Sequence, residues 1–342
     1  MNKPSVALVI LNWNTSQYLK KFLPSLLNTT YPNKEIYVID NFSSDNSINI
    51  LNQYFPSVHI LQMTSNKGFA AGYNFGLSQI EADYYLMINS DLEATPGFIE
   101  PLIELLESDP SIAACQPKLL ALEDKTMFEY AGAAGGWIDR LGFPFARGRI
   151  LTTIEKDEGQ YNETTPVFWA TGACMLIKSA VFKKTGGFYE YYYMHQEDID
   201  LCWRIQNMGY SIYTCPKSIV YHIGGGSLSW ENHLKTFLTF RNNYIMLSRN
   251  LPVPAAICTV VTRLATDFLG IIFFAVTGKA GISKAILKAE FAYIYWLFFC
   301  RNKVNNQPRG WNDCTGIYNN TILIPYFFFK KRKFSEIIRM SN

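Results

Sequence analysis

The sequence places amide and carboxylate side chains directly after three apolar segments in its first ninety or so residues. Strands of an open α/β sheet carry their ligand-binding loops at their carboxyl ends, so polar residues at three such ends indicate one shared binding site. Asn and Asp also end strands and cap helices for purely structural reasons, and that alternative applies to each position. The three segments are Asn12 to Asn14 after residues 6–11, Asp40 at the end of residues 35–40, and Asn89 to Asp91 after residues 84–88.

The third segment, Asn89-Ser90-Asp91, has the chemistry of a divalent-cation site. Mg²⁺ and Mn²⁺ are commonly held by one or two carboxylates together with phosphate oxygens of a substrate. The turn 66–72 contains Lys67 and precedes a predicted helix, so its backbone amides and the Lys67 ammonium are candidates for binding a pyrophosphate. Close packing of the helix explains the glycines of this turn equally well.

The elements that must position these residues alternate between strand and helix. Residues 6–11 are continuously apolar, which is typical of a buried parallel strand, and residues 35–40, 59–63 and 84–88 predict three more strands. Residues 69–78 predict one of the intervening helices. This alternation predicts an open, doubly wound α/β sheet. The loop after the first strand lacks the G-x-G-x-x-G pattern, which excludes a nicotinamide-dependent dehydrogenase.

The pattern becomes irregular between about residues 115 and 190. Residues 131–148 are rich in glycine and aromatic residues, and we expect them to form a mobile loop that faces a substrate. Residues 167–177 predict a strand with a glycine-containing bend.

The composition bounds the class of protein. Of the 342 residues, 49% are hydrophobic and 17% are charged, against about 25% charged in ordinary soluble domains. This composition is too apolar for a disordered chain and too mixed for a polytopic membrane protein. The seven cysteines form no C-x-x-C pair, which argues against a disulfide framework and a zinc site and indicates a reducing, cytoplasmic compartment.

The last ninety residues are basic, with 12 Lys and Arg but 4 Asp and Glu after residue 250. Residues 255–276 are apolar except for Arg263 and Asp267, which can pair on one helical face. Aromatic runs occur at 291–299 and 322–329, and four basic residues follow the second run. This arrangement predicts attachment to an anionic membrane surface, with a core helix and a solvated charge run as the alternative. Basic and aromatic residues occupy separate blocks, so we expect no nucleic-acid partner.

Seven motifs, in this order, resemble those of family 2 of the inverting GT-A glycosyltransferases, and in detail its bacterial rhamnosyltransferase-like branch. The resemblance covers about residues 4–250 and implies a GT-A catalytic domain, which is a Rossmann-like, doubly wound mixed sheet. Its nucleotide-binding half would span about residues 1–115 and its acceptor-side half about 116–250. A helical, aromatic and basic region would follow at 251–342 and associate with the membrane. The motifs are VALVILNWN, VIDNFSSDNS, NKGFAAGYNFG, MINSDLEATPG, WATGACMLIKSAVFKKTGGF, QEDIDLCWR and YHIGGGS.

This resemblance implies a nucleoside-diphosphate-sugar donor. Asn12, Trp13 and Asp40 would hold its base and ribose, with the Asp40 carboxylate accepting the imide proton of uracil or thymine. Lys67 would help to neutralise the leaving diphosphate.

The resemblance also implies a divalent metal ion, Mg²⁺ or Mn²⁺. Asp91 matches the last residue of the DXD motif and would ligate the ion. Asn89 replaces the first carboxylate of that motif and would contact the ribose or a metal-bound water, and Ser90 would belong to the same donor loop. His222 matches a second metal ligand of some family members; by itself, a lone histidine is more typical of packing.

Asp198 would be the general base. An inverting transfer is a single in-line displacement through an oxocarbenium-like transition state, in which a carboxylate takes the proton of the acceptor hydroxyl. Glu197, Asp198 and Asp200 cannot share one face of a helix, and the resemblance selects Asp198, with Glu197 orienting sugar hydroxyls. Arg204 is a candidate partner of a phosphate or of a structural carboxylate. For His195 we favour a packing role.

Trp169, Thr171 and Gly172 match the acceptor-side wall of the family, where Trp169 either stacks on a sugar or packs in the core. The expected function is transfer of a sugar, rhamnose from dTDP-rhamnose, to a glycan or lipid-linked acceptor in surface polysaccharide synthesis. The protein would act as a peripheral protein on the cytoplasmic face of the membrane. The alternatives are a UDP-galactose, UDP-glucose or UDP-N-acetylglucosamine donor and a non-catalytic nucleotide-sugar-binding or membrane scaffold protein. The sequence leaves open whether the protein forms a homo-oligomer.

Overall fold

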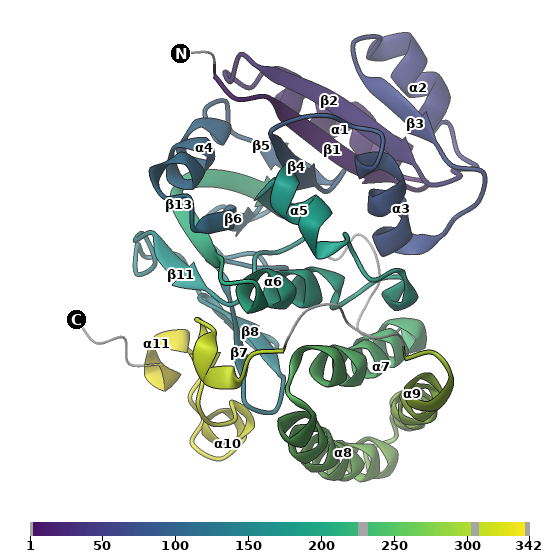
Figure 1. The fold of residues 1–342 in the computed structure, drawn as a ribbon, viewed down its shortest axis with the longest axis vertical. Coiled ribbons are helices and arrows are strands. Elements are labelled where there is room, and N and C mark those ends of the chain that lie inside the picture. The colour runs from purple at the N-terminus through teal and green to yellow at the C-terminus, as the bar shows by residue number, and fades with distance from the viewer. Residues whose placement is uncertain (1–2, 225–231, 302–307, 339–342) are drawn as a thin grey trace.

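A mixed nine-stranded sheet forms the upper half of the protein in a computed structural model that describes residues 3–224, 232–301 and 308–338 (Figure 1). Its strands are β1 Val6–Asn12, β2 Lys34–Asp40, β3 His59–Gln62, β4 Tyr84–Ile88, β5 Leu92–Ala94, β6 Ile112–Ala121, β11 Thr165–Val167, β12 Cys174–Lys178 and β13 Ser211–His222. Their order is β11-β13-β6-β12-β4-β1-β2-β3, with β5 also paired to β13. Strand β1 is parallel to β2 and β4, and β12 is antiparallel to both β4 and β6. The predicted doubly wound α/β sheet is confirmed.

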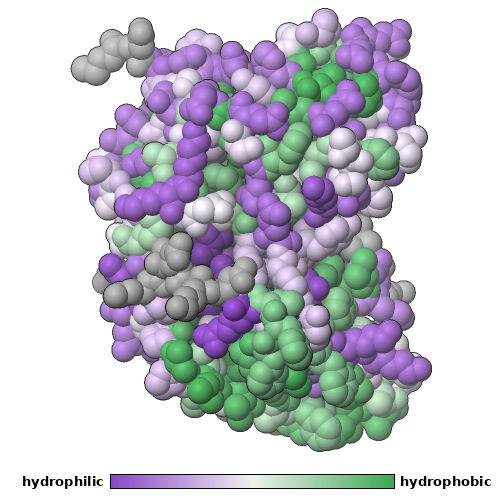
Figure 2. Space-filling model, turned by 45° about the vertical axis from the view of Figure 1, so that its right-hand side comes forward, coloured by the Kyte–Doolittle hydropathy of each residue, from purple (hydrophilic) through white to green (hydrophobic). Residues whose placement is uncertain are grey.

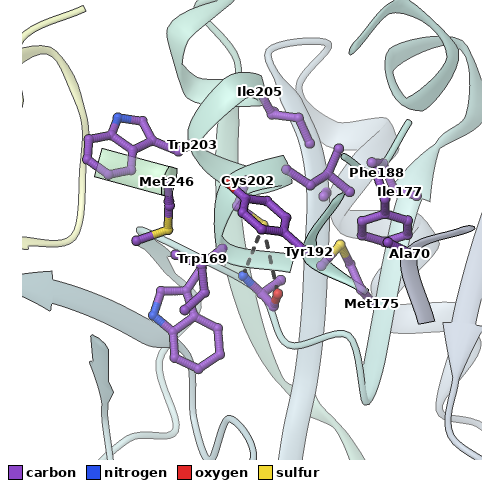
Figure 3. Packing of buried hydrophobic residues seen from close by; sticks show 14 of the residues in the cluster. Ala70, Trp169, Met175, Ile177, Phe188, Tyr192, Cys202, Trp203, Ile205 and Met246 are labelled. Atoms are coloured by element: carbon purple, nitrogen blue, oxygen red, sulfur yellow. Dashed lines mark hydrogen bonds between the residues drawn. The ribbon is translucent and has the colours of Figure 1, made fainter. Parts of the chain in front are cut away.

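Helices cover both faces of this sheet. Successive residues of a strand point to opposite sides, and here both sides carry apolar residues that must be buried. Val6 and Leu8 of β1 pack on the face covered by α1 Ser16–Leu27, α2 Ser47–Tyr54 and α4 Ile99–Ser108. Ala7 and Val9 pack on the other face, which is covered by α3 Gly68–Leu77, α5 Ser179–Thr185 and α6 Glu197–Asn207. Figure 3 shows this second core around Cys202 of α6.

Helix α3 lies very close to the sheet. A Cβ atom added at Gly72 would lie 2.6 Å from Cδ1 of Leu11, and one added at Gly76 would collide with the side chain of Ile39. A larger residue at either position would displace these side chains, so glycine lets the helix pack at this depth. Packing therefore explains Gly72 of the turn 66–72.

A second sheet, in the order β10-β9-β8-β7-β14, occupies the region that was expected to be a mobile loop. That expectation is wrong, because Ile138 and Phe145 are fully buried in a core of their own. Glycines with positive φ, such as Gly142 and Gly148, permit the tight turns between these short strands. The predicted strand 167–177 is likewise interrupted, since β11 ends at Val167 and β12 begins at Cys174. The strands are β7 Gly136–Asp139, β8 Pro144–Ala146, β9 Arg149–Ile150, β10 Thr153–Ile154 and β14 Ile317–Tyr318.

Three helices, α7 His233–Asn250, α8 Val253–Val276 and α9 Ala280–Phe299, pack together below the sheet (Figure 1). The chain then returns to the first 250 residues. Strand β14 pairs in parallel with β7, and the ring of Trp311 lies 4.8 Å from that of Trp203. The boundary expected at residue 250 is thus crossed by a shared sheet and a shared core. Short elements complete the fold: η1 Glu190–Tyr192, η2 Trp311–Asp313, α10 Leu323–Phe327 and α11 Phe334–Ile337.

The two charges of α8 face the protein. Arg263 Nε lies 2.8 Å from Asp267 Oδ2, and both side chains are buried. Arg263 also donates to Asn243 Oδ1 of α7 and to the carbonyl of Leu141, and Asp267 accepts from the hydroxyl of Tyr244. The predicted pairing on one helical face is confirmed.

Candidate active site

The carboxyl ends of β1 and β2 join Asn12 to Asp40. The strands are parallel with these two residues in register, and Asn12 Nδ2 donates to Asp40 Oδ1 at 2.8 Å. The Ser43 backbone N–H donates to the other carboxylate oxygen at 3.1 Å. Both side chains are buried. The protein therefore fixes the orientation of the Asp40 carboxylate by itself.

Two exposed aromatic side chains follow these strands. Trp13 comes after β1 and is 51% exposed, and Phe42 comes after β2 and is 57% exposed. Exposed aromatic rings at a binding edge offer flat apolar surfaces to a ligand. Trp13 was among the predicted residues, whereas Phe42 was not.

The loop after β4 is attached to the loop after β1. Thr15 Oγ1 donates to Asn12 Oδ1 at 2.6 Å and lies 3.0 Å from the hydroxyl of Ser90. Asn89 and Ser90 are partly buried, and Asp91 is 9% exposed. Because β1 and β4 are neighbours in the sheet, the Asn12–Asp40 pair and the segment Asn89-Ser90-Asp91 lie side by side at one edge of the sheet.

Asp91, His222 and Glu129 form a chain of buried side chains. His222 Nε2 lies 2.9 Å from Asp91 Oδ1, and His222 Nδ1 lies 3.2 Å from Glu129 Oε2. Asn89 Nδ2 approaches the same Nε2 atom at 3.5 Å. Burial acts to lower the pKa of His222, but the neighbouring carboxylates of Asp91 and Glu129 outweigh it and raise the pKa to about 10.

These donors suit a divalent cation. A histidine that ligates a metal commonly turns its other ring nitrogen to a carboxylate, which fixes the tautomer and orients the ring. The Glu129 carboxylate lies beside Nδ1 of His222, and the other ring nitrogen, Nε2, lies beside the Asp91 carboxylate. Among the residues that the structure describes, no cluster of three or more His, Cys, Asp or Glu side chains is arranged to hold a metal ion. Two protein ligands would therefore need oxygens from a diphosphate.

Asp198 lies in the first turn of α6 and is held by backbone amides. Its Oδ2 accepts from the N–H of Gly172 at 2.9 Å, and its Oδ1 accepts from the N–H of Ile199 at 2.8 Å. Burial raises the pKa of Asp198, against the effect of these two hydrogen bonds. The carboxylate is thus oriented by the backbone, with a raised affinity for a proton.

Glu197 adds a second carboxylate beside Asp198. It is 6% exposed, and its Oε2 atom has no hydrogen-bond partner among the described residues. Burial first, and the charge of Asp198 second, raise the pKa of Glu197 well above its usual range. Adjacent carboxyl groups with raised pKa values are typical of acid–base sites.

Two consecutive residues connect these carboxylates to the candidate metal ligands. Gly172 donates to Asp198, and the carbonyl of Ala173 accepts from the N–H of Asn89 at 2.9 Å. Asp91 follows Asn89 by two residues. Residues 172–173 thus link the segment that carries the candidate base to the loop that carries the candidate metal ligand.

The turn before α3 does not present its amides to a ligand. The Lys67 N–H donates to Asn41, the Gly68 N–H to Asn66, and the next two amides to the carbonyl of Tyr193. The expectation that these amides face a pyrophosphate is therefore wrong. The side chain of Lys67 is exposed and remains a candidate.

Two of the residues expected on the acceptor-side wall are part of the core. Trp169 is 3% exposed, donates from Nε1 to the carbonyl of Trp137, and lies in the packed interior shown in Figure 3. Thr171 is 2% exposed and accepts from the N–H of Ala173. Trp169 therefore packs in the core, which was one of its two expected roles. Of Trp169, Thr171 and Gly172, Gly172 is the residue that binds the candidate base Asp198.

Arg204 is a structural partner. Its Nε lies 2.8 Å from Asp200 Oδ2, and its Nη1 donates to the carbonyl of Thr185. Asp200 also accepts from the hydroxyl of Tyr192 and from Asn250. Burial raises the pKa of Asp200, but the neighbouring Arg204 and Arg249 lower it further than burial raises it. This network anchors the start of α6.

Sequence reasoning missed Glu129, Thr15 and Ser43. Glu129 lies in the stretch that appeared irregular, and no spacing relates it to His222, 93 positions further on. Thr15 and Ser43 follow the recognised segments, where hydroxyl residues also begin helices. Of the motif YHIGGGS, residues 225–227 lie outside the described residues.

Comparisons with known proteins agree with these motifs. The sequence pattern of glycosyl transferase family 2 matches residues 7–186. The chain is 27% identical over 231 residues to N-acetylglucosaminyl-diphospho-decaprenol L-rhamnosyltransferase of Mycobacterium tuberculosis, covering 63% of this chain and 75% of that protein. It is 26% identical over 261 residues to rhamnosyltransferase WbbL of Escherichia coli K12, covering 72% and 96%.

The fold is similar to the crystal structure of GalNAc-T7 with UDP, GalNAc and Mn²⁺, with a TM-score of 0.57 and 15% sequence identity. That similarity covers 72% of this chain and 48% of the GalNAc-T7 chain, and it establishes the fold alone. The family match spans more than half of the chain and ends at residue 186, so it includes Gly172 but not Asp198. The chain therefore belongs to glycosyl transferase family 2, with a GT-A fold, a helical C-terminal extension and sequence similarity to bacterial rhamnosyltransferases.

Proposed function

We propose that this glycosyltransferase is inverting and metal-dependent, and that it transfers rhamnose from dTDP-rhamnose to a glycan or lipid-linked acceptor in surface polysaccharide synthesis. The observation that carries the proposal is the bridge formed by residues 172–173. Gly172 binds the Asp198 carboxylate, and Ala173 binds the loop that carries Asp91. A single-displacement transfer needs a base on one side of a sugar and charge neutralisation on the other, and this bridge supports that arrangement.

In the reaction, Asp198 accepts the proton of the acceptor hydroxyl as that oxygen bonds to the anomeric carbon. The bond from this carbon to the diphosphate oxygen breaks, and the nucleoside diphosphate leaves with the electron pair. Asp91 and His222 would hold the divalent cation, whose positive charge stabilises the leaving diphosphate when bound. Lys67, exposed at the start of α3, adds a second positive charge. Glu197 orients sugar hydroxyls beside the base.

The donor site would use the edge formed by β1 and β2. Asp40 is oriented by Asn12 and Ser43 to accept the imide proton of a pyrimidine base. Trp13 and Phe42 offer the exposed aromatic surfaces there. Rhamnose is proposed because two relatives are named rhamnosyltransferases. A UDP-hexose donor would use the same contacts to the base.

The C-terminal helices supply a surface suited to a membrane. By length and composition α8 can cross a bilayer. The mean hydropathy of its apolar stretch is 1.8, and 28% of that stretch is buried in the protein. Crossing would require α8 to leave α7 and expose Arg263 and Asp267, at a cost of about 2.5–3.5 kcal/mol for each charge near the bilayer centre. We therefore propose that α8 lies along the cytoplasmic membrane surface with its charged face on the protein.

Large apolar side chains cover the outer faces of α8, α9 and α10. Figure 2 shows hydrophobic residues gathered over the lower part of the molecule, where α8 and α9 lie. Four consecutive basic residues, 330–333, follow α10 and would add about 1 kcal/mol each near an anionic surface. The most exposed apolar residues are Ile257, Val261, Leu269, Val276, Phe291, Phe298, Phe299, Phe327, Phe328 and Phe329.

The catalytic proposal is tested with Asp198→Asn. We expect a loss of transfer of at least a thousandfold, retained nucleotide binding, and no turnover of the wild type in a chelator. The exposed Asp109→Asn, at the opposite end of the sheet, is the matched control and should keep full activity. Unchanged turnover in Asp198→Asn would contradict the assignment. Binding without turnover of any donor by the wild type would favour the non-catalytic scaffold.

The donor is identified by a thermal-shift panel of nucleotide sugars with Mn²⁺ or Mg²⁺. A ligand that binds the folded state raises Tm, and at equal concentration a tighter ligand raises it more. A larger shift with dTDP-rhamnose than with UDP-hexoses supports the proposed donor. The reverse order would support the alternative.

The membrane proposal is tested by sedimentation with phosphatidylglycerol vesicles. Replacing Phe298 and Phe299 with Ser should release the protein, whereas Tyr54→Ser on α2, which is 52% exposed, should not. Replacing residues 330–333 with Gln should weaken binding to these vesicles more than to neutral ones. Full retention of the Phe298→Ser, Phe299→Ser variant would contradict the proposed surface.

A further inference from the structure

The backbone that leads into α6 contains a strained turn. Tyr193 has φ 65° and ψ −63°, and the N–H of Met194 donates to the carbonyl of Tyr192 at 2.7 Å. This is the γ-turn with positive φ, which is rare and strained.

Two more residues with positive φ follow. His195 has φ 70° and Gln196 has φ 72°, in a region that residues other than glycine seldom adopt. Helix α6 begins at the next residue, so Asp198 comes two positions after Gln196. We call residues 192–196 the base-proximal turn. Backbone in such conformations persists only where the surrounding structure holds it in place.

One buried side chain of α7 holds this turn. The two N–H groups of Asn242 Nδ2 are shared among three carbonyl oxygens, those of Tyr192 at 3.0 Å, Met194 at 2.9 Å and His195 at 2.8 Å. Asn242 is fully buried. These three carbonyl oxygens also fix the orientation of the Asn242 amide. With the amide flipped, Oδ1 would face the three oxygens and be repelled by them.

The remaining carbonyl of residues 192–195, that of Tyr193, is bound by helix α3. Tyr193 O accepts from the N–H groups of Phe69 and Ala70 at the start of α3. Arg241 supports the turn from below by donating to the carbonyl of Tyr192 and, through Nε, to Asn242 Oδ1. Carbonyls 192–195 are thus all bound, three of them by Asn242.

We propose that Asn242 is a positioning residue for the base, which it places by clamping the base-proximal turn. This inference rests on the proposed function, in which Asp198 is the base. The clamp fixes where α6 begins, and that start point decides whether the Asp198 carboxylate reaches the N–H of Gly172. Misplacement of a reacting group by about 1 Å can cost a hundredfold in rate. Asn242 therefore affects the chemical step without touching the substrate.

The clamp can be removed while α7 stays in place. Asn250, two turns further along α7, donates to Asp200 of α6 at 2.7 Å. The same helix also offers a matched control. Asn243 is buried like its neighbour, donates to the carbonyl of Gly142 at 2.7 Å and accepts from Arg263. It binds another loop and α8, and within the described part of the chain no hydrogen bond joins it to the base-proximal turn.

The test compares Asn242→Ala with Asn243→Ala by donor turnover with a soluble acceptor, nucleotide binding and thermal unfolding. We expect Asn242→Ala to lower kcat at least tenfold, to keep the nucleotide Kd within twofold, and to move the acid limb of the kcat–pH profile. Asn243→Ala should keep kcat and the pH profile, with a comparable loss of Tm. A merely structural role of Asn242 would not separate the two variants in this way.

Two results would overturn the inference: kcat within twofold of the wild type in Asn242→Ala, or an equal loss of kcat in Asn243→Ala. If Asn242→Ala does not fold, Asn242→Ser retains one donor and should lose kcat partially; a folded Ser variant with wild-type kcat would also overturn it. Failure of this inference is separate from failure of the proposed function. An inactive Asp198→Asn beside a fully active Asn242→Ala would reject the clamp alone.

Discussion

His222 Nε2 lies 2.9 Å from Asp91 Oδ1, although 131 positions separate the two residues in the chain. Strand β13 brings them together, because His222 at its end is in register with Leu92 of β5, next to Asp91. Glu129 closes the chain on the other side of the ring at 3.2 Å. A side chain that no motif marked thus orients the proposed second metal ligand.

Replacing that side chain should weaken metal binding. We expect Glu129→Gln to lower Mn²⁺ affinity about 10–100-fold, the usual cost of losing a carboxylate behind a metal-bound histidine. Titration calorimetry with Mn²⁺ and nucleotide measures it. Glu155→Gln is the control, since Glu155 is equally buried but binds Tyr161 and Phe334 elsewhere. Equal affinity of the Glu129 variant and the wild type would refute the role of Glu129.

Glu197 and Asp200 should respond in opposite ways to loss of charge. Glu197 is buried with an unpartnered oxygen beside Asp198, so Glu197→Gln should raise the free energy of unfolding at pH 7 by about 0.5–2 kcal/mol while lowering activity. Asp200 is ion-paired and buried, so Asp200→Asn should destabilise by about 3–5 kcal/mol. Denaturant unfolding of both variants measures the contrast. Destabilisation by Glu197→Gln would show that its charge is satisfied in the folded protein.

The rate should rise with pH through the ionisation of Asp198. Burial raises the pKa of Asp198, so the acid limb of kcat should lie above the range of an ordinary aspartate. Burial and the charge of Asp198 also raise the pKa of Glu197 well above its usual range, and we assign the acid limb to Asp198 because the N–H of Gly172 binds its carboxylate. Glu197→Gln should therefore leave the acid limb where it is. A limb displaced in that variant would mean that Glu197 ionises first.

His195 should make the protein less stable in acid. Burial first, and the charge of Lys235 second, lower the pKa of His195 from 6.5 to about 4. The unfolded chain then binds more protons between these values, so stability falls as pH drops from 6.5 towards 4, by at most about 3 kcal/mol. His195→Asn, which tolerates positive φ, should reduce this slope in denaturant unfolding. The exposed His59→Gln should leave the slope unchanged; an equal slope in all three proteins would remove His195 as its cause.

The sequence alone was sufficient for strands β1 to β4 and for the polar residues that follow three of them. Residues 6–10 are buried on both faces of a parallel strand, so the apolar character of this segment is continuous and readable. Asn12 and Asp40 end such strands and Asp91 follows the end of β4 by three residues, and parallel neighbours must bring these ends to one edge of the sheet. The pairing of Arg263 with Asp267 was equally readable, because helical spacing of four residues places both on one face.

Tertiary structure decided what depends on contacts between distant segments. Glu129 reaches His222 and Asn242 reaches the turn before Asp198 through packing that no local period encodes. The glycine and aromatic residues of 131–148 resemble a loop because short paired strands leave too few residues for a repeating pattern. Whether Trp169 meets a sugar or the core was a question of burial, which is fixed by what packs against a side chain, and the sequence of one segment does not contain that information.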